Sequence, residues 1–270
     1  MTEKPVPTST PRGVVTAGAD LLAGAVESQS VPVERVDWRP PMEGTADDLA
    51  TVALDPLRRT ANARAVDAML AVQAMLVDVA PASDVLGLQP GEFLHAGPPI
   101  TWERTSGPLR GALMGAAALE GLVEDPAQAP ALFESGSVAF EPCHHRSAVG
   151  PMAGVVSPSM WMFVLEDPAT GRRTFCSLNE GLGKVLRYGA YGPEVIERLR
   201  WMSDVLGPLL QTAVRSHGPV DVKAIAAQML QMGDEGHNRN RAGTLMFLRE
   251  ILPDLIGSGT ATTDVAEAAR

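Results

Sequence analysis

The stretch WMFVLEDPATGRRTFCSL, residues 161–178, decides the fold class of this chain. It holds two apolar strand candidates, Trp161–Leu165 and Thr174–Leu178, on either side of DPATG. The residues of that central segment are typical of turns, so the pattern predicts a β-hairpin. A hairpin followed by a purely helical region indicates an α+β fold.

The region that follows the hairpin changes in character from strand to helix. Apolar residues recur there at helical spacing, which predicts three amphipathic helices with no strand between them. This change places a soft boundary near residue 192, between a mixed α/β unit (15–192) and a helical part (193–256). The three helices are PEVIERLRWMSDVLGPLLQTAVR (193–215), DVKAIAAQMLQM (221–232) and RAGTLMFLREILPDL (241–255).

The region ahead of the hairpin alternates between helical and extended patterns, which suggests an α/β unit. Residues 1–14 are rich in proline, threonine and charge and are expected to form a flexible tail. Residues 257–270 begin with turn-forming residues and are expected to form a tail or linker. The expected helices cover 17–29, 60–73 and 107–122, and the expected strands cover 31–38, 74–80 and 138–140.

Composition excludes several classes of protein. A net charge of −10 disfavours nucleic acid and anionic membrane surfaces, because phosphate binding depends on Lys and Arg. Two cysteines, Cys143 and Cys176, cannot build a disulfide framework. The N-terminus lacks the apolar segment of a signal peptide, and no apolar stretch approaches the length of a membrane span. We therefore expect a cytoplasmic protein.

FEPCHHRSAVGPMAG, residues 140–154, is the most distinctive polar segment. Cys143, His144 and His145 are consecutive, and consecutive side chains diverge on both helices and strands. Zinc ligands are usually two to four residues apart, so a metal site is the less favoured interpretation and no cofactor is expected. Imidazoles beside Arg146 suit a pocket that accepts an anion, with histidine as acid or base and arginine as clamp.

Two more segments add candidates for anion binding. LHAGPPITWERTSGPLRG (94–111) supplies His95, Arg104 and Arg110, and Arg110 falls in the first turn of a helix, where free N–H groups favour anions. SLNEGLGKVLRYG (177–189) is not a Walker A loop, but its glycines and lysine could face an oxyanion. Its candidates are Asn179, Glu180 and Lys184. An ordinary turn with solvated charges remains the alternative for both segments.

MGDEGHNRNRAG, residues 232–243, is the fourth polar segment. If it is helical, Asp234, His237, Asn238 and Arg241 share one face, and Asp234 could orient His237 as a carboxylate orients a catalytic imidazole. The alternative is a helix N-terminus with Asp234 or Asn238 as the cap.

Taken together and in this order, these segments resemble the YlbE-like family, which includes the AllG subunit of bacterial oxamate carbamoyltransferase. The resemblance begins at about residue 18, and its motifs are long and specific. Members of that family usually continue well past Arg270, so the chain is expected to be a C-terminally shortened member. The segments that carry the resemblance are VDWRPP (36–41), HAGPPITWER (95–104), FEPCHHRSAVGPMAGVVSPSM (140–160), SLNEGLGKVLRYGA (177–190), LRWMSDVLGP (199–208) and MGDEGHNRNRAGT (232–244).

The resemblance implies a subunit that acts with FdrA-like partners in the breakdown of allantoin, a purine product. There, oxalurate and phosphate would be exchanged for oxamate and carbamoyl phosphate. Such a transfer needs an anion site, an oxyanion donor and a proton donor. From residue type, Arg110, Arg146 and Lys184 would bind the anion, Asn179 would face the oxyanion, and His144, His145 or His237 would move the proton.

Two rival functions remain open on the sequence alone. One is a non-catalytic partner subunit of an FdrA-like complex, and the other is a metal-dependent amidohydrolase. The transferase hypothesis requires five polar residues to converge in one cleft: His95, His144, His145, Asn179 and His237.

Overall fold

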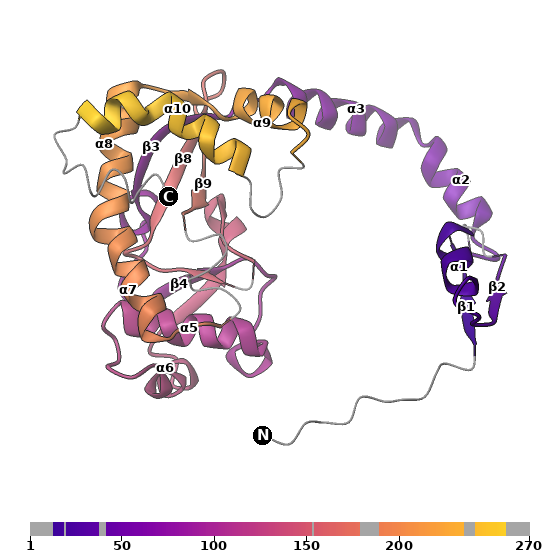
Figure 1. The fold of residues 1–270 in the computed structure, drawn as a ribbon, viewed down its shortest axis with the longest axis horizontal. Coiled ribbons are helices and arrows are strands. Elements are labelled where there is room, and N and C mark those ends of the chain that lie inside the picture. Colours follow the sequence, from indigo (N-terminus) through magenta and orange to yellow (C-terminus); the bar gives the residue numbers. More distant parts are fainter. Residues whose placement is uncertain are drawn as a thin grey trace. The chain divides into compact units, whose positions relative to one another are not determined.

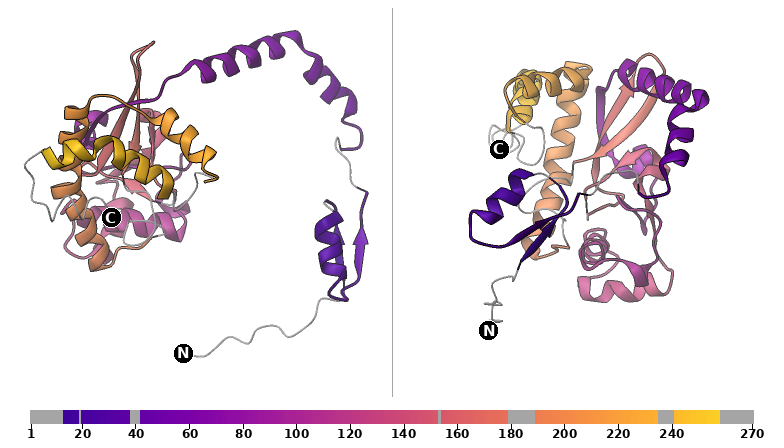
Figure 2. Two further views of the ribbon diagram at one scale, coloured as in Figure 1. Left: turned by 45° about the horizontal axis from the view of Figure 1, so that its top comes forward. Right: turned by 90° about the vertical axis from the view of Figure 1, so that its right-hand side faces the viewer.

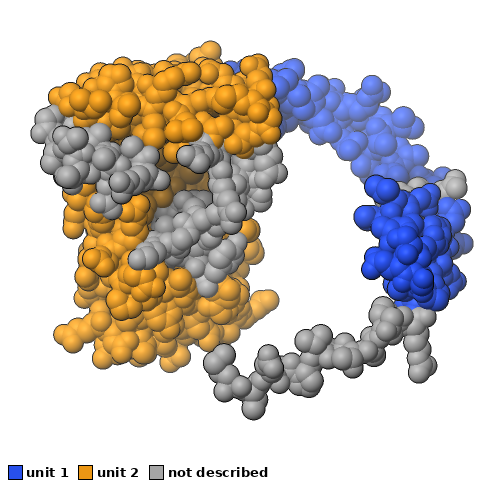
Figure 3. All heavy atoms as spheres, viewed as in Figure 1, with its two compact units in different colours: residues 1–71 blue, residues 72–270 orange. Residues whose placement is uncertain are grey.

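The computed structural model describes residues 13–18, 20–37, 42–152, 154–178, 189–234 and 241–257. The chain divides into two compact units, Met1–Ala71 and Val72–Arg270 (Figure 3). Mixed sheets and several helices confirm the α+β class. The expected soft boundary near residue 192 lies inside the second unit. No helix within the described ranges is both long and apolar enough to cross a bilayer.

The first unit begins with two parallel strands, β1 (Val14–Thr16) and β2 (Val33–Arg35), connected through helix α1 (Asp20–Glu27). The carboxylate of Glu27 forms an ion pair with Arg35 and so ties α1 to β2. Helices α2 (Ala46–Leu54) and α3 (Pro56–Ala71) follow, and neither has a buried residue. Ala23 is the only buried apolar residue among the described part of this unit, so little hydrophobic burial stabilises it.

The second unit is built on a five-stranded sheet with the order β10-β3-β8-β9-β6 (Figure 1). The hairpin predicted from residues 161–178 is present, since β8 and β9 pair antiparallel across the DPATG turn. Asp167 closes that turn by accepting a hydrogen bond from Thr170 Oγ1 at 2.7 Å. The strands are β3 (Met75–Pro81), β6 (Ala148–Val149), β8 (Trp161–Asp167), β9 (Arg172–Ser177) and β10 (Val220–Asp221).

The expectation that no strand separates the C-terminal helices is wrong. Strand β10 lies between two of them and pairs antiparallel with β3, with Val220 opposite Leu76. Two residues are too few to show an alternating pattern in sequence. The side chain of Asp221 also accepts a hydrogen bond from Ala224 N at 2.9 Å, so the same residue ends the strand and caps the next helix.

Helices from the C-terminal part cover one side of this sheet (Figures 1 and 2). Arg215 on α8 forms a fork with Asp78 on β3, with Nε and Nη2 donating at 2.9 and 2.8 Å. Apolar residues of α8 and α10 share a core with Leu76 and Val79 of β3. The C-terminal helices are α7 (Pro193–Trp201), α8 (Gly207–His217), α9 (Val222–Gln231) and α10 (Arg241–Gly257), and α7 packs instead in the core of a second sheet.

A second, smaller sheet has the order β5-β4-β7, with β5 parallel and β7 antiparallel to β4. Phe93 and Leu94 of β4 are fully buried in a core shared with α5, α6 and α7. The strands are β4 (Glu92–His95), β5 (Ala139–Pro142) and β7 (Val155–Val156), and the two helices that precede β5 are α5 (Gly107–Leu119) and α6 (Ala129–Glu134).

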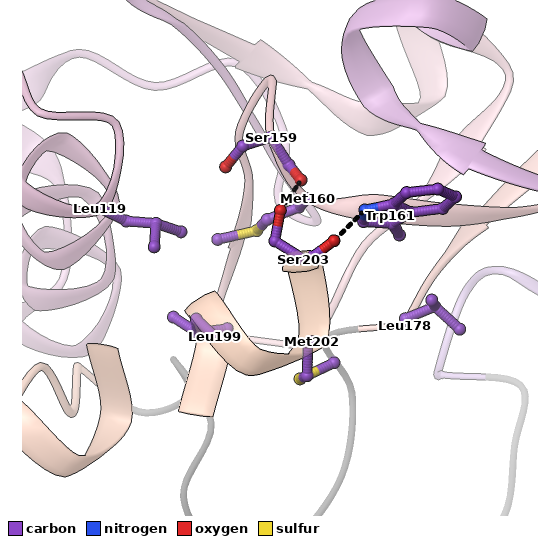
Figure 4. Close-up of a pocket in the computed structure, with 8 residues that line it drawn as sticks. All are labelled: Leu119, Ser159, Met160, Trp161, Leu178, Leu199, Met202 and Ser203. Carbon is purple, nitrogen blue, oxygen red and sulfur yellow. Dashed lines mark hydrogen bonds between the residues drawn. The ribbon is translucent and has the colours of Figure 1, made fainter. Parts of the chain in front are cut away.

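A π-helical segment, η4 (Met202–Leu206), connects α7 to α8 and joins the two cores. Leu199 of α7 belongs to the core of the small sheet, whereas Leu209 of α8 belongs to the core of the large sheet. Trp161 Nε1 donates to Ser203 O at 3.1 Å, and Ser203 Oγ donates to Ser159 O at 3.3 Å (Figure 4). The segment is thereby fastened to the first residue of β8.

Gly207, directly after this segment, is the point of closest packing. A Cβ at this position would lie 2.2–2.5 Å from three ring atoms of Trp161. Real carbon atoms do not approach so closely, so either the indole or the helix would have to move.

We therefore expect Gly207→Ala to lower the free energy of unfolding by about 1–3 kcal/mol, although Gly→Ala in a helix is normally stabilising by about 1 kcal/mol. Urea denaturation followed by tryptophan fluorescence measures the change. Gly257→Ala is the matched control, because no heavy atom lies within 4 Å of that Cβ position. Equal stabilities of the two variants would contradict the packing argument, and Trp161→Leu should reduce the cost of Gly207→Ala.

Candidate functional site

His95 is the last residue of β4 and lies at the centre of the candidate site. It pairs with Pro142 of β5 on one side and with Val155 of β7 on the other. Its side chain is buried at 1% exposure, and its ring lies 5.7 Å from that of Phe140. Because β4 and β5 are parallel, their carboxyl ends bring His95 close to the turn that carries the other two candidate histidines.

The polar atoms of the His95 ring are in different situations. Nδ1 accepts a hydrogen bond from the backbone N–H of Gly97 at 3.2 Å. Nε2 is the one buried side-chain nitrogen or oxygen, among the residues the structure describes, that has no hydrogen-bond partner. Burial lowers the pKa of His95 below its ordinary value, and the nearby imidazoles of His144 and His145 lower it further.

A cavity of about 320 Å³ is lined by His95 and by Arg104. Arg104 ends the 3₁₀ turn η1 (Trp102–Arg104), and its guanidinium pairs with no residue in the described part of the chain. Ser106, the N-cap of α5, and Leu109 in its first turn also line the cavity. An arginine and the start of a 13-residue helix favour a negatively charged occupant.

Arg110 is in the first turn of α5, as expected, but its guanidinium is turned back toward η1. Nη2 donates to the carbonyl oxygen of Trp102 at 3.0 Å and Nε to Thr105 Oγ1 at 3.3 Å. The guanidinium carbon also lies 4.8 Å from the centre of the Trp102 ring. In this arrangement Arg110 holds the turn that carries Arg104.

Cys143, His144, His145 and Arg146 form the 3₁₀ turn η3 (Cys143–Arg146), immediately after β5. His144 and His145 are exposed, and their ring centres lie 4.7 Å apart, edge to face. The turn therefore directs both imidazoles to the surface.

Glu141, which the sequence interpretation passed over, orders this turn. Its carboxylate accepts from Arg146 Nε at 2.7 Å and lies 3.2 Å from His145 Nδ1. Burial acts to raise the pKa of Glu141, but the hydrogen bonds from Arg146 and His145 outweigh it, so the pKa is below its ordinary value. Arg146 Nη1 also donates to Leu86 O at 3.0 Å, at the end of α4 (Ala82–Leu86), so two protein acceptors engage this guanidinium.

Several predicted site residues lie outside the described residues: Asn179, Glu180, Lys184, His237 and Asn238. Asp234 is described, and it follows α9 in a non-helical segment, whereas Arg241 is the first residue of α10. The helical face expected to start at Asp234 therefore does not include that residue. Within the described ranges, no group of three or more His, Cys, Asp and Glu residues could hold a metal ion.

Sequence reasoning missed two further groups. Glu120, at the end of α5, accepts hydrogen bonds on one carboxylate oxygen from Ser157 Oγ, Ser159 N and Ser159 Oγ. This carboxylate fastens the chain just after β7, the strand that pairs with His95. Ser106 was also missed. Of the three missed residues, Glu120, Ser106 and Glu141, only Glu141 had a local signal in the sequence, which is its spacing of four residues from His145.

Cys143 is buried at 3% exposure, and neither cysteine forms a disulfide. Burial raises the pKa of the Cys143 thiol from 9.0 to about 11. The thiol is therefore protonated at neutral pH, whereas a thiolate is the form that binds metals and attacks carbon.

This shift predicts a loss of stability in alkali. The folded protein keeps the Cys143 proton up to about pH 11, whereas the unfolded chain releases it near 9.0. The stabilisation is therefore complete below pH 9.0 and falls between pH 9.0 and about 11, by about 2–3 kcal/mol. Urea denaturation across this range should show a smaller loss for Cys143→Ala than for the wild type. Parallel curves for the two proteins would contradict the assigned pKa.

Comparison with known proteins gives several matches. Residues 138–270 match the family model described as oxamate carbamoyltransferase subunit AllG. The oxamate carbamoyltransferase subunit AllG of Escherichia coli (strain K12) is 46% identical over 198 residues, which are 72% of this chain and 47% of that protein. The uncharacterized protein YahG of the same organism is 38% identical over 258 residues, which are 93% of this chain and 55% of that protein.

Among solved structures, a conserved protein of unknown function from Enterococcus faecalis V583 is similar, with a TM-score of 0.74 and 40% identity. The match covers 77% of this chain and 50% of that one. The chain thus spans about half the length of the relatives that it matches. The family model over residues 138–270 and the 46% identity confirm the predicted assignment, and the chain belongs to the AllG family.

Proposed function

We propose that this chain is a subunit of an oxamate carbamoyltransferase-type enzyme and that its second unit binds a small anionic substrate in the cavity beside His95. The observation that carries the proposal is that His95 and Arg104 line one cavity at the start of α5. A small carboxylate or phosphate needs hydrogen-bond donors, and both the His95 ring and the Arg104 guanidinium have a nitrogen that no described residue engages. The name of the relative from Escherichia coli supports the reaction class.

The proposed reaction transfers a carbamoyl group between nitrogen and oxygen. In the direction from oxalurate, the bond between the carbamoyl carbon and the amide nitrogen breaks, and a bond from that carbon to a phosphate oxygen forms. The products are oxamate, whose amide nitrogen takes up a proton, and carbamoyl phosphate. The site must therefore hold a carboxylate, stabilise negative charge on the carbonyl oxygen and supply a proton.

Three groups of the described site suit these tasks. Arg104 suits the carboxylate, because its guanidinium is not engaged by a described residue. His95 suits an oxygen, because its Nε2 has no partner. His144 and His145 do not line the cavity, but an exposed imidazole on the adjacent turn suits proton transfer, and a carboxylate oxygen of Glu141 lies 3.2 Å from His145 Nδ1. Arg110 and Arg146 donate to the backbone carbonyls of Trp102 and Leu86, so we assign them a structural role.

The family model and the AllG relative from Escherichia coli are named as subunits, which favours a multisubunit complex. We propose that FdrA-like chains are the partners and that the complex works in allantoin breakdown in the cytoplasm. The alternative function is a non-catalytic subunit that binds the ligand or stabilises the same complex, with the chemistry on an FdrA-like chain.

Ligand-induced stabilisation tests whether this chain binds a substrate. Oxamate, oxalurate, phosphate and carbamoyl phosphate are added one at a time to the purified chain, and the thermal midpoint is measured. If the cavity binds one of them, the midpoint rises as the ligand exceeds its Kd. Arg104→Ala should weaken that binding by about 10-fold or more, because a charge-assisted hydrogen bond is worth about 1.5–3 kcal/mol.

Arg173→Ala is the control, since it removes the same charge from an exposed ion pair with Glu166 on the hairpin. Its ligand response should equal that of the wild type. If all four ligands leave the wild-type midpoint unchanged, the non-catalytic function is favoured. If Arg104→Ala responds like Arg173→Ala, the ligand binds elsewhere.

A further inference from the structure

We infer that His95 is held as the neutral tautomer with its proton on Nε2, and that this N–H donates a hydrogen bond to an oxygen of the bound oxyanion. The inference rests on the proposed function in one respect, which is that the cavity takes an oxyanion. It adds a defined role for one residue. His95 acts as a fixed donor, whereas a proton shuttle would have to change its charge.

The tautomer follows from the contact with Gly97. A backbone N–H can donate only to a nitrogen that carries a lone pair, and Gly97 N–H donates to His95 Nδ1 at 3.2 Å. Nδ1 is therefore unprotonated, and in a neutral ring the proton must be on Nε2.

The donor that results has no partner among the residues that the structure describes. Nε2 is buried, and no described acceptor reaches it. A buried N–H without an acceptor destabilises the folded state, and such groups are rare in native proteins. The same ring lines a cavity whose other polar walls are Arg104 and Ser106. An oxygen of a small oxyanion held by Arg104 would give this N–H the acceptor that it lacks.

The surroundings also keep the ring neutral. The side chain is 1% exposed, so a positive charge on it would lose its hydration. This burial lowers the pKa of His95, and the neighbouring imidazoles of His144 and His145 lower it further. Pairing of β4 on both sides then fixes the position of the ring. These constraints describe a preorganised donor.

Nitrogen-15 NMR of histidine-labelled protein at neutral pH tests the tautomer directly. Long-range proton–nitrogen correlations distinguish a protonated from an unprotonated ring nitrogen, and His95→Gln identifies which signals belong to His95. We expect a protonated Nε2 and an unprotonated Nδ1. A proton on Nδ1, or on both nitrogens, would overturn the inference whether or not any anion binds.

The second arm adds oxamate, inorganic phosphate and acetate in turn. The Nε2–H signal of His95 should shift with whichever anion raises the thermal midpoint. His95→Leu should raise the Kd of that anion by about 10- to 100-fold, whereas His95→Gln, which keeps an N–H donor, should lose less. An anion that binds in an Arg104-dependent manner without moving the Nε2–H signal would overturn the inference.

The two arms separate this inference from the proposed function. If acetate shifts the signal as strongly as oxamate and phosphate do, the donor role of His95 stands and the proposed substrate class is wrong. If oxamate binds but the tautomer is the opposite one, the proposed function stands and the role of His95 is wrong. The spectrum of the wild type decides the tautomer even if His95→Leu fails to fold.

Discussion

The second unit depends on the packing of Gly207 against the indole ring of Trp161. Trp161 opens β8, the strand between β3 and β9 in the larger sheet, and its Nε1 also holds the π-helical segment through Ser203. Because residue 207 has no side chain, the start of α8 can lie directly on the ring. This contact thus positions the whole helical run. Helix α7, before Gly207, packs in the core of the small sheet, and α8, after it, packs in the core of the large sheet.

The candidate site uses the small sheet in a similar way. His95 has a strand on each side, and the chain just after β7 is fastened to the end of α5 by Glu120. The start of the same helix lines the cavity. Arg110 donates to the backbone carbonyl of Trp102, and Arg146 is held by the Glu141 carboxylate and by Leu86 O, whereas no described residue engages the Arg104 guanidinium. Arg104 thus supplies positive charge to the cavity, while the hydrogen bonds of Arg110 keep the turn that carries Arg104 in place.

Much of the fold was predictable, because its signals are local. The hairpin of residues 161–178 and the three C-terminal helices follow from short-range pattern, and the structure has them. Strand β10 was missed, since only its pairing with β3 defines it. In the site, His95 and Arg104 were predicted from residue type. Their convergence, the missing partner of Nε2 and the role of Glu120 depend on contacts between distant segments, which residue spacing does not encode.

The π-helical segment also sets the rotation between the two halves of this helical run. A π-turn contains one residue more than the corresponding α-helical turn, and one residue turns a helix by about 100°. The run from residue 193 to 217 is uninterrupted, and its apolar residues belong first to one core and then to the other. If the segment wound as a regular α-helix with the same number of residues, Leu209, Ala213 and their neighbours would turn by about 100° away from β3. The extra residue of the π-turn therefore keeps both halves of one helical run facing their own cores.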